Sequence, residues 1–193
     1  MKRICLFAGS NRGAREEYAQ AAQQLARELV SRGCDVVYGG GKVGMMGVLA
    51  DATLAAGGKV IGVIPRALLE KEVAHGGLTE LRVVASMHER KAMMAELSDG
   101  FIALPGCLGT LEEFFEVLTW AQLGLHPKPC GLLNVSGYFD RLLEFLDLSV
   151  EERFVKSQHR ALVITATSPT ELLERIAAYR PPHVEKWIDR ASS

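Results

Sequence analysis

The stretch FIALPGCLGTLEEFFEV, residues 101–117, indicates the fold of this 193-residue chain. An apolar run that is typical of a buried strand ends at Pro105 and Gly106, and the residues from 109 onward repeat apolar side chains with the period of a helix. A buried strand that leads through a short loop into a helix is half of a strand–helix–strand unit. Such units build parallel sheets.

The same alternation runs along the whole chain. Apolar runs predict strands at 2–9, 34–40, 58–65, 81–86, 100–106, 129–135 and 161–166. Helical periodicity and capping residues predict helices at 14–32, 44–56, 87–98, 109–123, 138–147 and 168–178. Because the strands are apolar on both faces, we expect an α/β fold, a doubly wound parallel sheet with helices on both faces. The length fits one domain over 1–180 with a C-terminal tail at 181–193.

The composition excludes several classes of protein. With 48% apolar residues and a formal net charge of −1, the chain can form a core and lacks the basic stripe of a nucleic-acid-binding protein. The apolar run before Gly9 is shorter than a signal peptide or a membrane helix, so we expect no membrane partner. The cysteines lack metal-ligand spacing, which predicts reduced thiols in a cytoplasmic protein without a bound metal. They are Cys5, Cys34, Cys107 and Cys130.

Glycine-rich loops follow several predicted strands. In an open parallel sheet, ligands bind beyond the carboxyl ends of the strands, where the strand order reverses. Ser10 and Gly41 lie in such loops and are candidate phosphate-binding residues. The spacing Gly39-x-Gly41-x-x-Gly44 is that of a dinucleotide-binding loop, but no acidic residue closes the next strand to bind a ribose. Two interpretations stay open: a tight turn with close helix–sheet packing, or a lining for phosphate or ribose.

The loop at 105–110 is a stronger candidate for a phosphate site. Gly106 and Gly109 allow backbone amides to converge at a helix N-terminus, which carries a partial positive charge. The hydroxyl of Thr110 can serve as a further donor or as the helix cap. The alternative is an ordinary capped helix in which Glu112 and Glu113 only complement the helix dipole.

Helical spacing separates these two acidic residues. Glu113 shares its face with Val117 and Trp120, so its carboxylate loses hydration and its pKa should rise. A carboxyl group of raised pKa suits acid–base or charge-stabilising chemistry. Glu112 lies on the neighbouring row with Thr119.

The segment SMHERKAMMAEL, residues 86–97, predicts a helix that Ser86 caps, with Glu89 at the capping-box position. Arg90 lies on the apolar stripe of this helix, where a guanidinium must extend to water or meet an anion. Lys91 lies on the next face, where we expect a solvated charge. Because this helix and the loop at 105–110 follow successive strands, Arg90 can meet Glu113, either as an active-site pair or as a structural ion pair.

These residues resemble a known family. SMHERK (86–91) followed by LPGCLGTLEEFFEVLTWAQLG (104–124) is similar to the paired signatures MHxRK and PGGxGTxxE of the LONELY GUY (LOG) family. Its members are cytokinin-activating phosphoribohydrolases, long mislabelled as lysine decarboxylases. The likeness extends to LFAGSNRG and VVYGGGKVGMMGVLADA, and so spans nearly the whole chain.

The resemblance implies a Rossmann-like homodimer that hydrolyses the N-glycosidic bond of a purine nucleoside 5′-monophosphate to free base and ribose 5-phosphate, without a metal or redox cofactor. It assigns the catalytic roles to Arg90 and Glu113. Around the nucleotide it places Glu72, Lys91, Gly106, Gly109, Thr110, Glu112 and Thr119. Cys107 stands where the family has a glycine. If φ is positive there, the cysteine is strained by about 1–2 kcal/mol, and otherwise it adds a side chain beside the ligand.

Three other functions stay open. A nucleotide-binding or carrier protein of the same fold would bind without turnover, which Cys107 favours. A pyridoxal-phosphate decarboxylase would need Lys42 or Lys91 for a Schiff base and would be coloured. An NAD-dependent oxidoreductase is disfavoured by the missing acidic residue. The substrate also stays open, since it can be plain AMP or a nucleotide with an isoprenoid-modified adenine. The apolar helix 114–123 can form either a subunit interface or part of the core.

Overall fold

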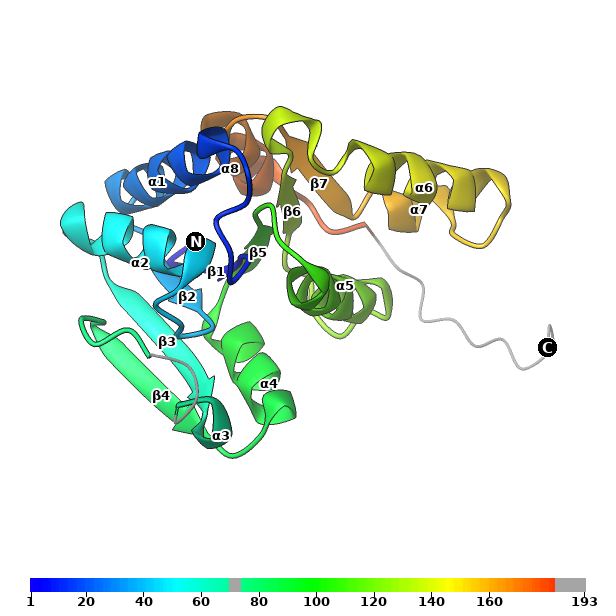
Figure 1. The fold of residues 1–193 in the computed structure, drawn as a ribbon. Coiled ribbons are helices and arrows are strands. Elements are labelled where there is room, and N and C mark those ends of the chain that lie inside the picture. The colour runs from blue at the N-terminus through cyan, green and yellow to red at the C-terminus, as the bar shows by residue number, and fades with distance from the viewer. Residues whose placement is uncertain (70–73, 183–193) are drawn as a thin grey trace.

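A computed structural model describes residues 1–69 and 74–182 of the chain. Within these residues, seven parallel strands form one sheet in the order β4-β3-β2-β1-β5-β6-β7 (Figure 1). The strands are β1 (Arg3–Phe7), β2 (Asp35–Tyr38), β3 (Val60–Pro65), β4 (Glu80–Val84), β5 (Gly100–Ala103), β6 (Cys130–Leu133) and β7 (Val163–Ala166). Each lies within or beside a range predicted from the sequence.

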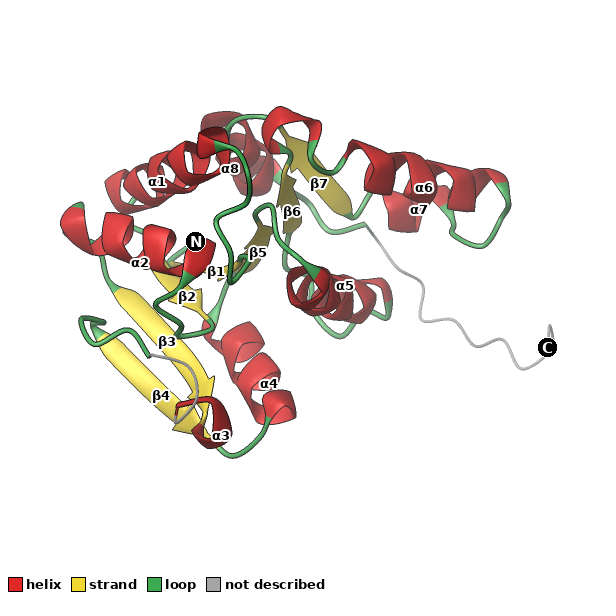
Figure 2. Cartoon of the chain, in the orientation of Figure 1, coloured by secondary structure: helices red, strands yellow, loops and turns green. Residues whose placement is uncertain are grey.

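Helices pack on both faces of this sheet (Figure 2). They are α1 (Glu16–Ser31), α2 (Gly44–Ala55), α3 (Arg66–Leu69), α4 (Met87–Leu97), α5 (Leu108–Gln122), α6 (Asp140–Glu151), α7 (Ser157–Arg160) and α8 (Pro169–Ala178), with a 3₁₀ turn at Val135–Gly137. The expected doubly wound α/β fold is confirmed. The prediction missed α3 and α7, because four residues are too few to show a helical period. In the described part of the chain, no helix has the length and apolarity to span a bilayer.

The core has two layers, one on each face of the sheet. In β1, Ile4 and Leu6 pack with α1, α2 and α8, whereas Cys5 and Phe7 pack with α4 and α5. Side chains alternate between the faces of a strand, so a strand buried on both faces must be apolar throughout. Full burial of one such side chain stabilises the fold by about 1.5–3 kcal/mol.

The strand order reverses between β1 and β5, the neighbours at the centre of the sheet. Phe7 pairs with Ala103 at their carboxyl ends, and the loops that follow come into contact there (Figure 1). A Cβ atom added to Gly9 would lie 3.2 Å from the Cα atom of Gly106, closer than most such contacts. The fold therefore brings the loop after β1, which contains Gly9, and the loop at 105–110 together where open parallel sheets bind ligands.

Candidate active site

Arg90 lies in the first turn of α4, and its side chain is largely covered by protein. Ser86 caps this helix as predicted, its hydroxyl accepting the Glu89 N–H at 3.1 Å. Glu89 in turn accepts the N–H of Ala85, not that of the cap residue. The guanidinium reaches the sheet edge, where Nε donates to the Val63 carbonyl at 3.2 Å and Nη2 donates to the Gly39 carbonyl at 3.4 Å.

The glycine-rich loop at 39–44, which follows β2, provides room for this guanidinium. A Cβ atom at Gly39 would overlap Arg90 Nη2, so only glycine fits beneath the arginine. Gly44 has φ +63° and lies against the Ser10 backbone, which leaves no space for a side chain. Gly41 is buried and forms an isolated bridge with Ala74. These contacts account for Gly39 and Gly44 by close packing against protein atoms.

Arg90 and Glu113 form an ion pair, with 3.4 Å between Nη1 and Oε1. The side chains are only 11% and 12% exposed. Burial raises the pKa of Glu113, and the attraction of Arg90 lowers it by less. The rise agrees with the apolar face predicted for Glu113. Since the pKa stays raised, the loss of hydration outweighs the arginine in setting the charge of this carboxyl group.

Lys91 reaches from α4 to α5 and is not the solvated charge that we expected. Its Nζ atom lies 2.5 Å from Glu112 Oε1 and 3.0 Å from Glu116 Oε1. Burial lowers the pKa of Lys91, but the hydrogen bonds to the two glutamates outweigh it and raise the pKa. Thr119 follows one turn later on α5, exposed, with its hydroxyl donating to the Phe115 carbonyl at 2.7 Å.

The loop at 105–110 differs in detail from the prediction. Helix α5 begins at Leu108, so Glu112 and Glu113 lie in its second turn, where they do little for the helix dipole. Thr110 does not cap the helix; its buried side chain fills the space beside Gly106, where a Cβ atom would overlap it. The space around Gly109 is open.

Cys107 occupies the N-cap position of α5 without strain. Its φ is −99°, in the extended region, so the family's glycine is not required there by backbone conformation. The thiol is exposed. The cysteine therefore causes no backbone strain, and the remaining effect of replacing the family's glycine is the side chain that it adds beside the ligand.

A cavity of about 150 Å³ lies where the strand order reverses. It is lined by Gly9, Asn11, Arg12, Gly13, Tyr18, Pro105, Gly106, Cys107 and Tyr138. The Tyr138 hydroxyl donates to the Gly106 carbonyl at 2.6 Å and so fastens the loop. The sequence reasoning missed Arg12 and Tyr138, although both follow carboxyl ends of strands, β1 and β6, which is the signal that could have found them.

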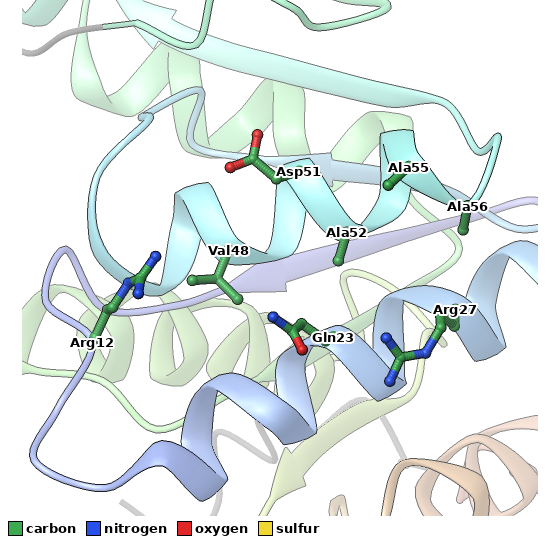
Figure 3. A pocket seen from close by; sticks show the side chains of 8 residues that line it. All are labelled: Arg12, Gln23, Arg27, Val48, Asp51, Ala52, Ala55 and Ala56. Atoms are coloured by element: carbon green, nitrogen blue, oxygen red, sulfur yellow. The ribbon is translucent and has the colours of Figure 1, made fainter.

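Most of the predicted residues thus lie beyond the carboxyl ends of the strands. Ser10 is exposed there, in the loop after β1, whereas Gly41 is buried under another segment. Glu72 lies outside the described residues. A groove of about 450 Å³ between α1 and α2, lined by Arg12, Gln23, Arg27, Asp51 and small apolar residues, contains none of the predicted site residues (Figure 3).

The fold and the site define a Rossmann-like α/β protein with an arginine–glutamate pair beside a glycine-rich helix N-terminus. A protein-family profile described as "Possible lysine decarboxylase" matches residues 46–176. The chain is 52% identical over 180 residues to the cytokinin riboside 5′-monophosphate phosphoribohydrolase LOG5 of Arabidopsis thaliana, covering 93% of this chain and 79% of that protein. The chain is 51% identical over 191 residues to LOG1 of the same plant, covering 99% of this chain and 89% of that protein. The chain therefore belongs to the LONELY GUY (LOG) family.

Solved structures share the fold at lower identity. The molybdenum cofactor binding protein of Rippkaea orientalis is 25% identical, with a TM-score of 0.68 over 92% of this chain and 97% of that chain. The molybdenum cofactor carrier protein of Chlamydomonas reinhardtii is 19% identical, with a TM-score of 0.68 over 92% and 99%. The latter likeness concerns the fold alone.

Proposed function

We propose that the protein hydrolyses the N-glycosidic bond of a purine nucleoside 5′-monophosphate, releasing the free base and ribose 5-phosphate. The observation that carries this proposal is the largely covered Arg90–Glu113 pair beyond the carboxyl ends of the strands, on the helices that flank the loop at 105–110. The names of relatives at about half identity supply the substrate class.

The loop at 105–110 binds the 5′-phosphate in this proposal. The first amides of α5 have no carbonyl acceptor inside the helix and can donate to phosphate oxygens, and the helix dipole favours the negative charge. Gly106, Gly109 and the buried Thr110 shape this loop, and Cys107 borders it. Binding energy from the phosphate then positions the distant ribosyl bond for reaction.

Glu113 acts on the sugar. Cleavage of the ribosyl C–N bond builds positive charge on the ribose ring while water approaches the opposite face. The carboxylate stabilises that charge and orients or deprotonates the water, and its raised pKa makes it a better base. Arg90 is fixed by two backbone carbonyls and by Glu113, so it can hold the substrate and favour departure of the base.

The remaining predicted residues form the wall of the nucleotide site in this proposal. Lys91 joins Glu112 and Glu116 across the gap between α4 and α5, which holds Glu112 in place. Glu112 and Thr119, which share one side of α5, face the nucleotide in this proposal. Ser10 and Gly41 contribute from the loops after β1 and β2. Glu72 completes the set that the family resemblance supplies.

The observations disfavour the three alternative functions. The identity to the phosphoribohydrolases is twice that to the cofactor-binding protein, which disfavours a carrier without turnover. A Schiff base at Lys91 is disfavoured because its raised pKa keeps the amine protonated. The packing of Gly39 and Gly44 against protein atoms disfavours a dinucleotide in that loop.

The proposal includes a cytoplasmic homodimer that binds neither nucleic acid nor membrane. All four cysteines are free thiols, as expected in a reducing compartment. The central apolar residues of α5 are buried, so core packing accounts for them. Exposed apolar side chains that a second copy could cover are Leu123, Leu125, Phe145 and Leu148. Light scattering during size-exclusion chromatography should give twice the mass of the chain.

The test is release of free base, measured by chromatography after incubation with AMP and with isopentenyladenosine monophosphate. Turnover of either substrate by a colourless protein supports the proposal, and the faster one defines the preference. Arg90→Ala and Glu113→Ala should lose this activity. Binding of both nucleotides without any base release would instead identify a carrier.

A further inference from the structure

His75 is a buried imidazole that the proposed chemistry does not use. The residue is 8% exposed, and both ring nitrogens have partners. Nδ1 accepts the Gly77 N–H at 3.1 Å, and Nε2 lies 2.8 Å from Asp51 Oδ1. A backbone N–H only donates, so Nδ1 carries no proton. The proton is therefore on Nε2, which donates to the carboxylate.

The segment around His75 crosses the glycine-rich loop at 39–44. The His75 N–H donates to the Gly40 carbonyl at 3.1 Å, and Ala74 forms the bridge with Gly41. The carbonyl of the preceding residue, Gly39, accepts from Arg90 Nη2. Two hydrogen bonds and the Gly39–Gly40 peptide between them thus connect His75 to the guanidinium that contacts Glu113.

This loop needs an external anchor. Its three successive glycines have no side chains to pack, and glycine is the most conformationally free residue. Gly40 has φ +80°. Asp51 lies on α2, whose residues Met45 and Leu49 are buried in the core, so it offers a rigid attachment point. Figure 3 shows its carboxylate turned away from the side chains of α1, and it bonds to His75 instead.

We propose that His75, as the neutral ring with its proton on Nε2, is a positioning residue for the proposed hydrolysis. It ties residues 39–41 to Asp51 on α2 and so holds the Gly39 carbonyl where it orients Arg90 toward Glu113. The inference rests on the proposed function for its effect on catalysis. The hydrogen-bonded state of the ring itself does not depend on that function.

Removing the anchor should affect turnover and spare phosphate binding. Asp51→Ala deletes the acceptor of the Nε2 proton, and because misplacement of a catalytic group by an ångström costs up to about a hundredfold, we expect kcat to fall about tenfold. Inhibition by ribose 5-phosphate should stay within about twofold, since the loop at 105–110 is untouched. Asp51→Asn keeps an acceptor oxygen and should restore kcat to within about threefold of wild type.

A matched control separates positioning from loss of stability. Thr53→Ala removes a buried hydrogen bond to the Leu49 carbonyl on the same helix, without touching the loop. It should lower the melting temperature as much as Asp51→Ala and leave kcat unchanged. Wild-type kcat in Asp51→Ala, or an equal loss in Thr53→Ala, would overturn the positioning role.

Long-range proton–nitrogen NMR provides a readout that needs no substrate. The histidine signal that His75→Asn removes should show a protonated Nε2 and an unprotonated Nδ1 in the wild type. In Asp51→Ala the Nε2 proton should exchange faster with water, because its acceptor is gone. A proton on Nδ1 in the wild type would refute the inference. If the ring has the expected state but the wild type releases no base from either nucleotide, the proposed function fails and the inferred effect on catalysis fails with it.

Discussion

Glu113→Gln separates the catalytic role of the buried pair from its structural role. Glutamine has the same shape and keeps an oxygen that can accept from Arg90, but it cannot carry charge. Removing one partner of a buried ion pair typically costs about 3–5 kcal/mol, because the other charge is left unpaired. Here Arg90 retains the carbonyls of Val63 and Gly39 as acceptors. The raised pKa of Glu113 shows in addition that ionising this carboxyl in the folded state is unfavourable.

These two features predict a small change in stability and a large one in activity. The free energy of unfolding of Glu113→Gln at neutral pH should stay within about 1 kcal/mol of wild type, well below the cost of an unpaired buried charge. Loss of a positioned acid–base group costs about a hundredfold to ten-thousandfold, so kcat for base release should fall about a thousandfold, or about 4 kcal/mol.

The pH dependence has a defined sign. Because the folded-state pKa of Glu113 is raised above the ordinary value of 4.5, the folded protein binds the proton more tightly than the unfolded chain. The contribution of this group to stability is therefore full below 4.5 and is lost as the pH rises through the folded-state pKa. Urea unfolding at a series of pH values should show this loss in wild type and not in Glu113→Gln.

Destabilisation of the variant by more than about 3 kcal/mol would mean that the pair is chiefly structural. A fall in kcat of less than about tenfold would be smaller than the loss of an acid–base group gives, and would exclude that role for Glu113.

Three other substitutions test the site. Gly39→Ala places a methyl group where the guanidinium of Arg90 lies, and kcat for base release should fall at least tenfold by the cost of misplacing a catalytic group. Cys107→Gly should change the free energy of unfolding by less than about 1 kcal/mol, since φ is ordinary and glycine is accepted at an N-cap, and the fast reaction with Ellman's reagent should disappear. Tyr138→Phe removes the hydrogen bond to Gly106, worth about 0.5–1.5 kcal/mol, so KM should rise about twofold to tenfold at constant kcat.

Two substitutions serve as controls for this group. Gly76→Ala adds a methyl group where no atom lies within 4 Å, so it should leave kcat unchanged. Tyr18→Phe removes the hydroxyl of the ring that packs edge-to-face on Tyr138, and it should leave KM unchanged. An effect of either control as large as that of its partner would mean that packing, and not the named contact, matters.

Much of the fold followed from the sequence because the strands are buried on both faces. The run at 2–9 reads as a strand since Ile4 and Phe7 are both apolar although they face opposite layers. Helices with an N-cap, such as those that Ser86 and Ser168 begin, were placed to within a residue. The four-residue helices carry no such signals.

The errors in the site arose where one element meets another. A helical projection of α4 shows Lys91 off the apolar stripe, but not that two glutamates of α5 lie opposite it. The start of α5 at Leu108, one residue before the predicted start at 109, puts Glu112 at the beginning of the second turn instead of in the first. Nothing in the local sequence shows that Gly39 lies under Arg90. The two residues are 51 positions apart and meet only because of the order of the strands in the sheet.

A crystal structure of the Glu113→Gln variant soaked with AMP would examine the central claim most directly. We predict the phosphate on the amides of residues 106–110 and the ribose C1′ atom within about 4 Å of the residue-113 side chain, a distance that allows attack once charge is restored. A nucleotide bound instead in the groove between α1 and α2, with Arg90 and residue 113 facing only protein, would contradict it.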